Sequence, residues 1–436
     1  MPSKVSTSLV MGVGVAAALT ALAADRGHHA PAQVAGAPLV AGSAVPIAQA
    51  SPAAPRADQK ARSAGPLVGD AALGALLDLD HIERVADHYE APLRDGRRAI
   101  LTLDPIVQEA AERMLSRARA PSGAVVVTAT DGRILAVAGR RTEDPKGGAD
   151  GIADWRLAVD TWAPAASIFK IVTASALVEA GVGPDTRVCY HGGIRSVMES
   201  NLADARNDGR CEDLSFGVAH SQNAIIAKLA HRHLDPKRLA ATAQKLGVDG
   251  PLPDFALHGE GGQCEVPADK GLEFAKMAAG FSGTRLSVVG GALLANAIAS
   301  GGFSVTPRLV AEVVDGDRRS VIAAGPKKRV LAADVARKVA SMMVETCDSG
   351  SAAKAFPRSG RLGKGQVAGK TGTLSRSQPF YMQYSWFVGF APADQPSVSI
   401  AVLLGNAELW QIKAHQAARM VLEAAVDTDT RAVDRM

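Results

Sequence analysis

The chain has 436 residues, of which 47% are hydrophobic and 21% charged, with a formal net charge of +4. This balance permits a sizeable core, excludes wholesale disorder and is too weak a positive bias to predict nucleic-acid binding. Four cysteines are too few for a disulfide scaffold, and none has the C-x-x-C spacing typical of zinc sites. A polytopic membrane protein is also excluded, because only one segment is long and apolar enough to concern a membrane.

That segment, residues 9–24, follows a polar start and ends at Asp25-Arg26. A helix of this length would span about 24 Å, which is less than the ~30 Å hydrocarbon core of a bilayer. Ala21-Leu22-Ala23 has the small-x-small form of a cleavage site. Residues 1–26 therefore predict a signal peptide or, alternatively, an N-terminal membrane anchor. Either one would export the rest of the chain, so we expect an extracytoplasmic location, in the periplasm or on the outer face of the cytoplasmic membrane.

The remaining chain divides by composition into three parts. Residues 27–66 are rich in Ala, Pro, Gly and Ser and predict a flexible linker. Residues 67–98 are too few for an independent core, so we expect a short lead-in segment that packs on the domain after it. Residues 99–430 read as one continuous domain. The pairs His28-His29 and His231/His233 are typical of solvated positions, and we expect no metal and no cofactor.

The first elements of that domain carry clear local signals. Asp104-Pro105 is typical of an N-cap followed by Pro at the first helical position, which predicts a helix to about Ala118. Residues 123–128 and 134–137 are rich in β-formers and are separated by Asp131-Gly132, which predicts a hairpin.

Further elements follow the hairpin. Pro164 predicts the start of a helix to about Ala180 that is apolar on nearly all sides and therefore buried. Residues 385–390 and 398–404 predict strands, and residues 410–425 predict a final amphipathic helix. Strands near both ends with helices between them indicate an α+β fold, with an antiparallel sheet assembled from both ends of the domain.

Three short motifs carry candidate chemistry. In Ser167-Ile168-Phe169-Lys170 the Ser hydroxyl and the Lys amine share a helical face, so the amine could serve as base if burial lowers its pKa. Ser221-Gln222-Asn223 is a weaker signal, since a helix cap would use the same residues. Lys370-Thr371-Gly372-Thr373 places a cation and two hydroxyls on an extended segment, where glycine permits close approach. Ser351-Ala352-Ala353-Lys354 is a second S-x-x-K match, so the first motif alone is not decisive.

The order and spacing of the motifs give them meaning together. The S-x-N and K-T-G motifs start about 54 and about 203 residues after Ser167. In this order they resemble the motif set of the penicillin-binding transpeptidase family, within the serine D,D-peptidase and β-lactamase-like superfamily. The resemblance extends over residues 100–426, through segments 102–104, 131–136, 286–307, 350–352 and 386–392. It implies a five-stranded antiparallel sheet flanked by helices, with an all-helical subdomain. Ser351 falls where the family usually carries Gly-Thr-Ala and so would not be the nucleophile.

The resemblance also implies roles. Ser167 would attack the D-Ala-D-Ala peptide bond, Lys170 would take its proton, and Ser221 would relay a proton to the leaving amine. Asn223 would hydrogen-bond the substrate amide. The substrate carboxylate would be held by the third motif: Lys370, Thr371, Gly372 and Thr373. The backbone N–H groups of Ser167 and Thr373 would form the oxyanion hole. The substrates would be peptidoglycan stem peptides, and β-lactam antibiotics would acylate Ser167.

Three alternatives share these motifs. A D,D-carboxypeptidase differs only in acceptor access, and a penicillin-sensing module would be a non-enzyme of the same fold. A β-lactamase needs a further base, usually Glu followed closely by Leu-Asn; the candidate Glu260 is followed by Gly261-Gly262, so the match fails. We therefore expect a peptidoglycan D,D-transpeptidase.

Two further expectations concern partners and cysteines. The chain has no room before residue 100 for a glycosyltransferase domain and lacks a long non-catalytic pedestal, so an auxiliary role and a separate glycosyltransferase partner are hypotheses. Cys189 and Cys211 bracket a loop before the S-x-N motif, and export would permit a disulfide between them. Cys264 and Cys347 could pair or stay free.

Overall fold

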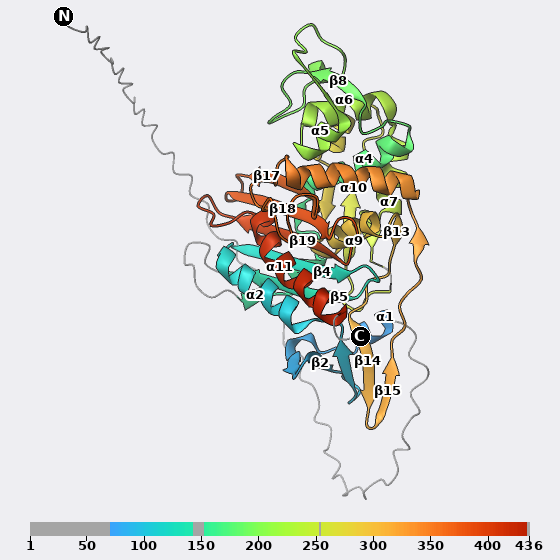
Figure 1. Cartoon of the computed structure of the whole chain (residues 1–436), viewed down its shortest axis with the longest axis vertical. Helices are drawn as coiled ribbons and strands as arrows, with labels where there is room; N and C mark the ends of the chain where they lie inside the picture. Colours follow the sequence, from blue (N-terminus) through green and yellow to red (C-terminus); the bar gives the residue numbers. More distant parts are fainter. Residues whose placement is uncertain (1–69, 143–151, 253, 434–436) are drawn as a thin grey trace, which may run out of the picture. The chain divides into compact units, whose positions relative to one another are not determined.

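The computed structural model describes residues 70–142, 152–252 and 254–433. A six-stranded antiparallel sheet lies at the centre of this part of the chain (Figure 1). Its strands, in spatial order, are β17 (Ala368–Arg376), β18 (Met382–Ala391), β19 (Val398–Asn406), β4 (Ser122–Ala129), β5 (Ile134–Arg141) and β6 (Ile152–Ala153). Five strands are long and the sixth is a two-residue addition at the β5 edge, so the predicted five-stranded sheet built from both ends of the domain is confirmed.

The sheet is buried on both faces. Along β4, Val125 and Val127 pack into one apolar cluster, whereas Ala124 and Val126 pack into the other, as the alternation of strand side chains requires. Helices α2 (Pro105–Ala118) and α11 (Ala414–Val433) cover the first face. Helix α9 (Val288–Ala299) covers the second, and α10 (Ala333–Asp348) packs along β17. Strand β17, which carries the K-T-G motif, is the edge strand of the sheet. Its backbone pairs with β18 on one side only.

The predicted helix at residues 105–118 has the expected bounds, and its N-cap Asp104 accepts hydrogen bonds from the backbone N–H groups of Ile106 and Val107. The last helix begins at Ala414 and not at residue 410. Ser385 Oγ accepts the backbone N–H of Ala414 at 3.1 Å and marks this start. The side chain of Trp410 is half exposed on the loop before it.

The helical subdomain lies beyond β17 at the upper end of Figure 1. It contains α4 (Lys170–Glu179), α5 (Leu214–Ala219), α6 (Asn223–His233), α7 (Pro236–Lys245) and α8 (Leu272–Ala278). It also carries a two-stranded ribbon, β8 (Arg187–Tyr190) with β9 (Arg210–Asp213), and a short 3₁₀ helix, η3 (Glu199–Asn201). Cys189 and Cys211 face each other across this ribbon and form a disulfide, whereas Cys264 and Cys347 are free.

The expected helix start at Pro164 is wrong. Pro164 instead lies in β7 (Ala163–Pro164), where it pairs with Arg285 and its carbonyl accepts Trp386 Nε1 at 2.9 Å. A 3₁₀ helix, η2 (Ala166–Phe169), follows, and α4 begins only at Lys170. The cause is Ala166, whose φ of 51° is left-handed and cannot belong to a helix that starts at Pro164. Helix α4 is buried almost throughout, as its apolar sequence predicts.

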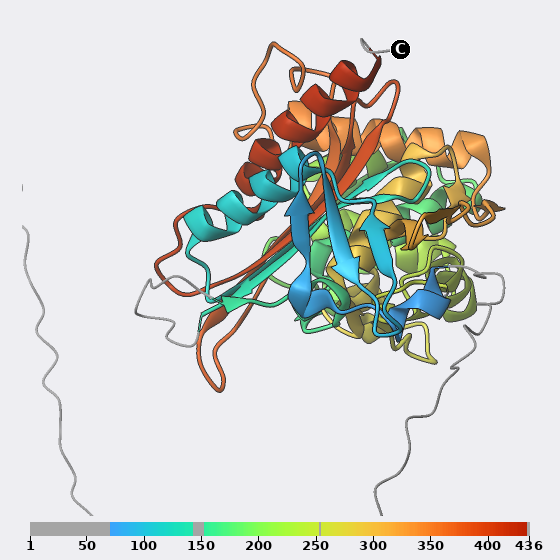
Figure 2. The ribbon, with the colours of Figure 1, turned by 90° about the horizontal axis from the view of Figure 1, so that it is seen from below.

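A second sheet includes the strands of the lead-in segment, which lie in the foreground of Figure 2. Its order is β1 (Glu83–Val85), β2 (His88–Pro92), β3 (Arg98–Leu101), β14 (Val310–Asp315) and β15 (Arg318–Val321). The buried carboxylate of Asp70 accepts backbone N–H groups from Ala256, Leu309 and Val310. The lead-in is thereby joined to the middle of the chain.

Smaller elements complete the fold. They are α1 (Ala71–Gly74), η1 (Leu79–His81), α3 (Arg156–Val159), β10 (Gly250–Pro251), β11 (Glu260–Cys264), β12 (Thr284–Leu286), β13 (Phe303–Ser304) and β16 (Lys328–Arg329). No helix within the described ranges is long and apolar enough to cross a membrane.

Candidate active site

Ser167 lies in η2, directly after the left-handed Ala166. The backbone of Gly280, which follows α8, lies against this turn: a Cβ at Gly280 would sit 2.2 Å from the Ala166 carbonyl oxygen. Only glycine permits that approach. Strained backbone of this kind is found mainly at functional sites, where surrounding structure holds it in place. Here it presents Ser167 at the floor of a cavity of about 360 Å³.

Lys170 is completely buried at the start of α4. Its Nζ lies 2.7 Å from Ser167 Oγ and donates to Asn223 Oδ1 at 2.7 Å and to the carbonyl of Ala279 at 2.8 Å. Burial, helped by the nearby positive charge of Lys370, lowers the pKa of Lys170 well below its usual value. A neutral amine beside a serine hydroxyl can accept its proton, which is the chemistry that the S-x-x-K spacing predicts.

Asn223 is the first residue of α6, and its carboxamide contacts the protein at both ends. Nδ2 donates to the carbonyls of Gly193 and Ile194 at 2.8 and 3.2 Å, and Oδ1 accepts from Lys170. We expected this residue to bind the substrate amide. Asn223 lines the cavity, so that role stays a prediction, and its contacts also support a role in orienting the Lys170 amine.

Ser221 lies between α5 and α6 with a left-handed φ of 56°. Its backbone N–H donates to the carbonyl of Val218 at 3.2 Å, which ties the turn to the end of α5. The residue lines the same cavity as Ser167 and Asn223, although the first motif is distant from the second in the sequence. Residues of the first two motifs therefore line one cavity. Ser167 directly follows the strained residue Ala166, and Ser221 is itself in a strained, left-handed conformation.

The third motif lies on the edge strand β17. Gly372 packs tightly against η2, because a Cβ there would lie 3.2–3.4 Å from Trp386, Ile168 and Ala166. Thr371 and Thr373, on either side of Gly372, line the same cavity as Ser167 and Ser221.

Lys370 is buried and does not line the cavity. Its Nζ donates to the carbonyl of Thr371 at 2.9 Å. Burial lowers its pKa to about 7, although the neighbouring Cys347 opposes this shift. Lys370 can therefore change charge near neutral pH when an anion approaches.

The structure brings all the predicted site residues together. Ser167, Ser221, Asn223, Thr371 and Thr373 line the cavity, and Lys170, Lys370 and Gly372 lie directly behind it. The other lining residues were not predicted from the sequence; they are Ile194, Arg195, Ala279, Gly280, Phe281, Leu374 and Ser375. They belong to loops and a strand end and carry no motif.

Two residues considered at the sequence level lie elsewhere. Ser351 is exposed with Lys354, and its hydroxyl contacts Thr371 Oγ1 at 2.5 Å, so it supports the third motif and does not repeat the first. Glu260 is exposed on β11, where it accepts hydrogen bonds from Thr161 and Gln263. It does not line the cavity, so it could not activate a water molecule for a β-lactamase reaction there.

Residues 122–424 match the family described as the penicillin binding protein transpeptidase domain. Because this match covers most of the chain, the protein belongs to that family. The expected family and fold class are therefore confirmed.

Curated relatives are similar over most of the chain. Peptidoglycan D,D-transpeptidase PbpA of Mycolicibacterium smegmatis is 25% identical over 360 residues, which are 74% of this chain and 70% of PbpA. Stage V sporulation protein D of Bacillus subtilis is 29% identical over 343 residues, which span 74% of this chain but only 51% of the relative.

Solved structures agree on the fold. The D,D-transpeptidase domain of a peptidoglycan glycosyltransferase from Eggerthella lenta matches with a TM-score of 0.63 and 25% identity, covering 83% of this chain and 91% of that one. Penicillin-binding protein A from Mycobacterium tuberculosis, solved as a ceftriaxone acyl-enzyme complex, matches with a TM-score of 0.62 and 22% identity, covering 76% and 80%.

Proposed function

We propose that the protein is a peptidoglycan D,D-transpeptidase that forms an acyl-enzyme on Ser167. The observation that carries the proposal is the buried Lys170 amine, 2.7 Å from Ser167 Oγ and held by two further acceptors. The similarity to proteins named peptidoglycan D,D-transpeptidase supports the substrate class. The mycobacterial protein that was solved as a ceftriaxone acyl-enzyme supports β-lactams as inhibitors.

The first half-reaction follows from these positions. Ser167 Oγ attacks the carbonyl carbon of the D-Ala-D-Ala peptide bond while Lys170 Nζ accepts the hydroxyl proton. The backbone N–H groups of Ser167 and Thr373 stabilise the oxyanion that forms. The C–N bond then breaks, the leaving D-Ala amine receives a proton through Ser221, and an ester to Ser167 remains.

The second half-reaction consumes that ester. The amine of a second stem peptide attacks the ester carbonyl and loses a proton, a new amide forms, and Ser167 Oγ regains its proton. The product is a cross-link, whereas attack by water would give a trimmed peptide. A β-lactam would stop after acylation, because its ring-opened ester deacylates slowly.

The substrate carboxylate would bind at the third motif. Thr371 and Thr373 line the cavity, and their hydroxyls can donate to it. Lys370 lies behind them, and a bound carboxylate would favour its protonated form. This arrangement accounts for a buried lysine whose pKa lies near neutrality.

We also propose that the domain works outside the cytoplasm, carried there by residues 1–26. The Cys189–Cys211 disulfide supports this, because structural disulfides persist mainly in oxidising compartments. A transpeptidase acts on peptides attached to polymerised glycan, so we propose a glycosyltransferase as a partner. N-terminal sequencing of the mature protein and co-purification test these two points.

The central test is covalent labelling with fluorescent penicillin. The wild type should become labelled and Ser167→Ala should not. Ser351→Ala, the other S-x-x-K serine, should still become labelled at saturating penicillin. Incubation with donor and acceptor stem peptides should then give cross-linked dimers. Trimmed peptide alone would indicate a carboxypeptidase, rapid turnover of penicillin a β-lactamase, and labelling with no peptide product a sensing module.

A further inference from the structure

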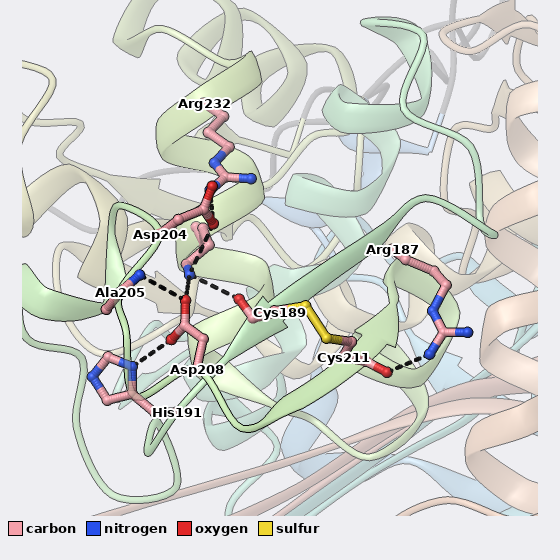
Figure 3. The surroundings of a disulfide bond; sticks show 9 residues. Arg187, Cys189, His191, Asp204, Ala205, Asp208, Cys211 and Arg232 are labelled. Atoms are coloured by element: carbon pink, nitrogen blue, oxygen red, sulfur yellow. Dashed lines mark hydrogen bonds and ion pairs between the residues drawn. A yellow bond between two sulfur atoms is a disulfide. The ribbon is translucent and has the colours of Figure 1, made fainter.

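The chain between β8 and β9, residues 191–209, forms a long loop beside the active-site cavity. The Cys189–Cys211 disulfide closes its base (Figure 3). Two of its residues, Ile194 and Arg195, line the cavity. The loop contains none of the three motifs, and none of its side chains takes part in the proposed reaction.

The loop is held from below by a buried lysine that the proposed mechanism does not use. Lys228 lies on α6, and its side chain is 0% exposed. Its Nζ donates to Asp208 Oδ2 at 2.7 Å and to the carbonyl of Cys189 at 2.8 Å. One ammonium group therefore joins the helix to the loop and to the disulfide at the base of the loop.

Asp208 extends this attachment across the loop, as Figure 3 shows. It accepts the backbone N–H of Ala205 at 3.0 Å, and its Oδ1 lies 2.6 Å from His191 Nδ1. Although burial acts to raise the pKa of Asp208, the hydrogen bonds from His191 and Lys228 hold it well below its usual range. The carboxylate therefore stays ionised at neutral pH and keeps both ends of the loop together.

A short path leads from His191 to the active site. Asn201 Nδ2 donates to the carbonyl of His191 at 2.9 Å and fixes the chain just before Gly193. Gly193 has a φ of 76°, and a Cβ there would lie 2.4 Å from Ala224 Cβ, so the loop crosses the start of α6 in close contact. Its carbonyl then accepts Asn223 Nδ2 at 2.8 Å.

We infer that the Lys228–Asp208 ion pair and the Cys189–Cys211 disulfide position the Asn223 carboxamide, and through it the Lys170 amine. Helix α6 thus contacts the loop at two places: the ion pair holds the loop, and the loop carbonyls orient Asn223 so that its oxygen faces Lys170 Nζ. Lys228 and Asp208 are positioning residues for the base, and they touch neither substrate nor Ser167. This inference rests on the proposed function, because it concerns how readily Ser167 is acylated.

The test separates binding of penicillin, measured as the Kd of the non-covalent complex, from the acylation rate constant measured by stopped flow. The Lys228→Met/Asp208→Asn pair removes both charges and leaves no buried ion without a partner. Cys189→Ser/Cys211→Ser and mild reduction of the wild type remove the second attachment. Lys245→Met is the matched control, since it removes an exposed lysine paired with Glu179 at 3.7 Å.

Both modified loops should slow acylation about tenfold, near the upper end of the effect of losing one neutral hydrogen bond, and should change the Kd less than about twofold. In an Asn223→Ala background the same changes should have no further effect, because the positioned group is already gone. Lys245→Met should acylate at the wild-type rate.

Acylation at the wild-type rate in folded, reduced protein would overturn the inference. The inference would also be overturned if the loop changes and Asn223→Ala slowed acylation by fully additive amounts. A change in the Kd with no change in the acylation rate constant would overturn it as well. If the neutral pair fails to fold, reduction of the folded wild type decides the question. A wild type that is not acylated at all would instead reject the proposed function.

Discussion

The hydroxyl of Ser351 lies 2.5 Å from the hydroxyl of Thr371, on the outer side of the K-T-G strand. This contact fixes the rotation of the hydroxyl of Thr371, a residue that lines the cavity. Ser351→Ala should therefore weaken binding of β-lactams and anionic peptides about three- to tenfold, the range for one neutral hydrogen bond. The effect should fall on the Kd and leave the acylation rate constant nearly unchanged.

A control for this prediction lies two residues earlier. Ser349 is also exposed, and its hydroxyl donates to the carbonyl of Glu345 in the preceding helix. Ser349→Ala should bind penicillin like the wild type. Equal titration curves for the Ser351 and Ser349 variants would contradict the role assigned to Ser351.

Gly280 supports the nucleophile turn, and a methyl group there should disrupt it. A Cβ at this position would lie 2.2 Å from the Ala166 carbonyl oxygen, so η2 must shift and take Ser167 with it. Gly280→Ala should lose acylation by at least about a hundredfold, since a displacement of about 1 Å can have that effect. Penicillin labelling over time measures this loss.

Gly181 provides a matched comparison, because it has the same φ of 88° and a Cβ added there would meet no atom within 4 Å. Gly181→Ala should cost about 1–2 kcal/mol of stability, the price of a left-handed side chain alone. It should still be acylated at the wild-type rate. If both alanine variants acylate normally, the contact with Ala166 does not control Ser167.

Lys170 should be irreplaceable as the base. Lys170→Arg keeps a positive charge but remains protonated at all accessible pH values, so it cannot accept the Ser167 proton. We expect acylation to fall by about a thousandfold or more in both Lys170→Arg and Lys170→Met. Lys276→Arg, on the more exposed face of α8, should acylate normally. Residual fast acylation of the arginine variant would show that another group removes the proton.

Lys370 should make the free energy of unfolding depend on pH. Its pKa is about 7 in the folded protein, whereas an unfolded lysine titrates near ~10.4. Between these values the unfolded state binds more protons than the folded state, so the free energy of unfolding rises with pH. Below pH 7 both states are protonated and the cost of burying the charge is greatest.

Urea unfolding of wild type and Lys370→Met at several pH values measures this contribution by difference, since burial, the main cause of the lowered Lys170 pKa, acts in both proteins. The stability of the wild type relative to the variant should increase steadily from about pH 7 to about pH 10. Lys245→Met, which removes an exposed lysine, should show no such trend. A flat difference for Lys370→Met would mean that the folded protein does not lower the Lys370 pKa.

The site could be located from the sequence where the spacing of two residues alone brings their side chains together. Ser167 and Lys170 are neighbours on one helical turn, so their contact could be expected without knowledge of the rest of the fold. The first hairpin and the helix at 105–118 were also predictable, because Asp104-Pro105 and Asp131-Gly132 act locally.

The rest depends on tertiary contacts that leave little trace in the sequence. Ala166 adopts a left-handed conformation without being glycine, so no local signal indicated that the helix would not begin at Pro164. Ile194 and Arg195 line the cavity from a loop that is closed by a disulfide and bound by Lys228, and these contacts join residues far apart in the sequence. Ser351 could be excluded as the nucleophile from motif order, but its contact with Thr371 required the packing of α10 on β17.

The order of strands in the central sheet has a consequence for how the protein is made. β4 pairs on one side with β5, which follows it directly, and on the other with β19, which comes from the opposite end of the domain. Until β19 has been synthesised, β4 is an apolar strand with one side unpaired, which is a template for aggregation. Chains released before Val398 should therefore be insoluble or quickly degraded.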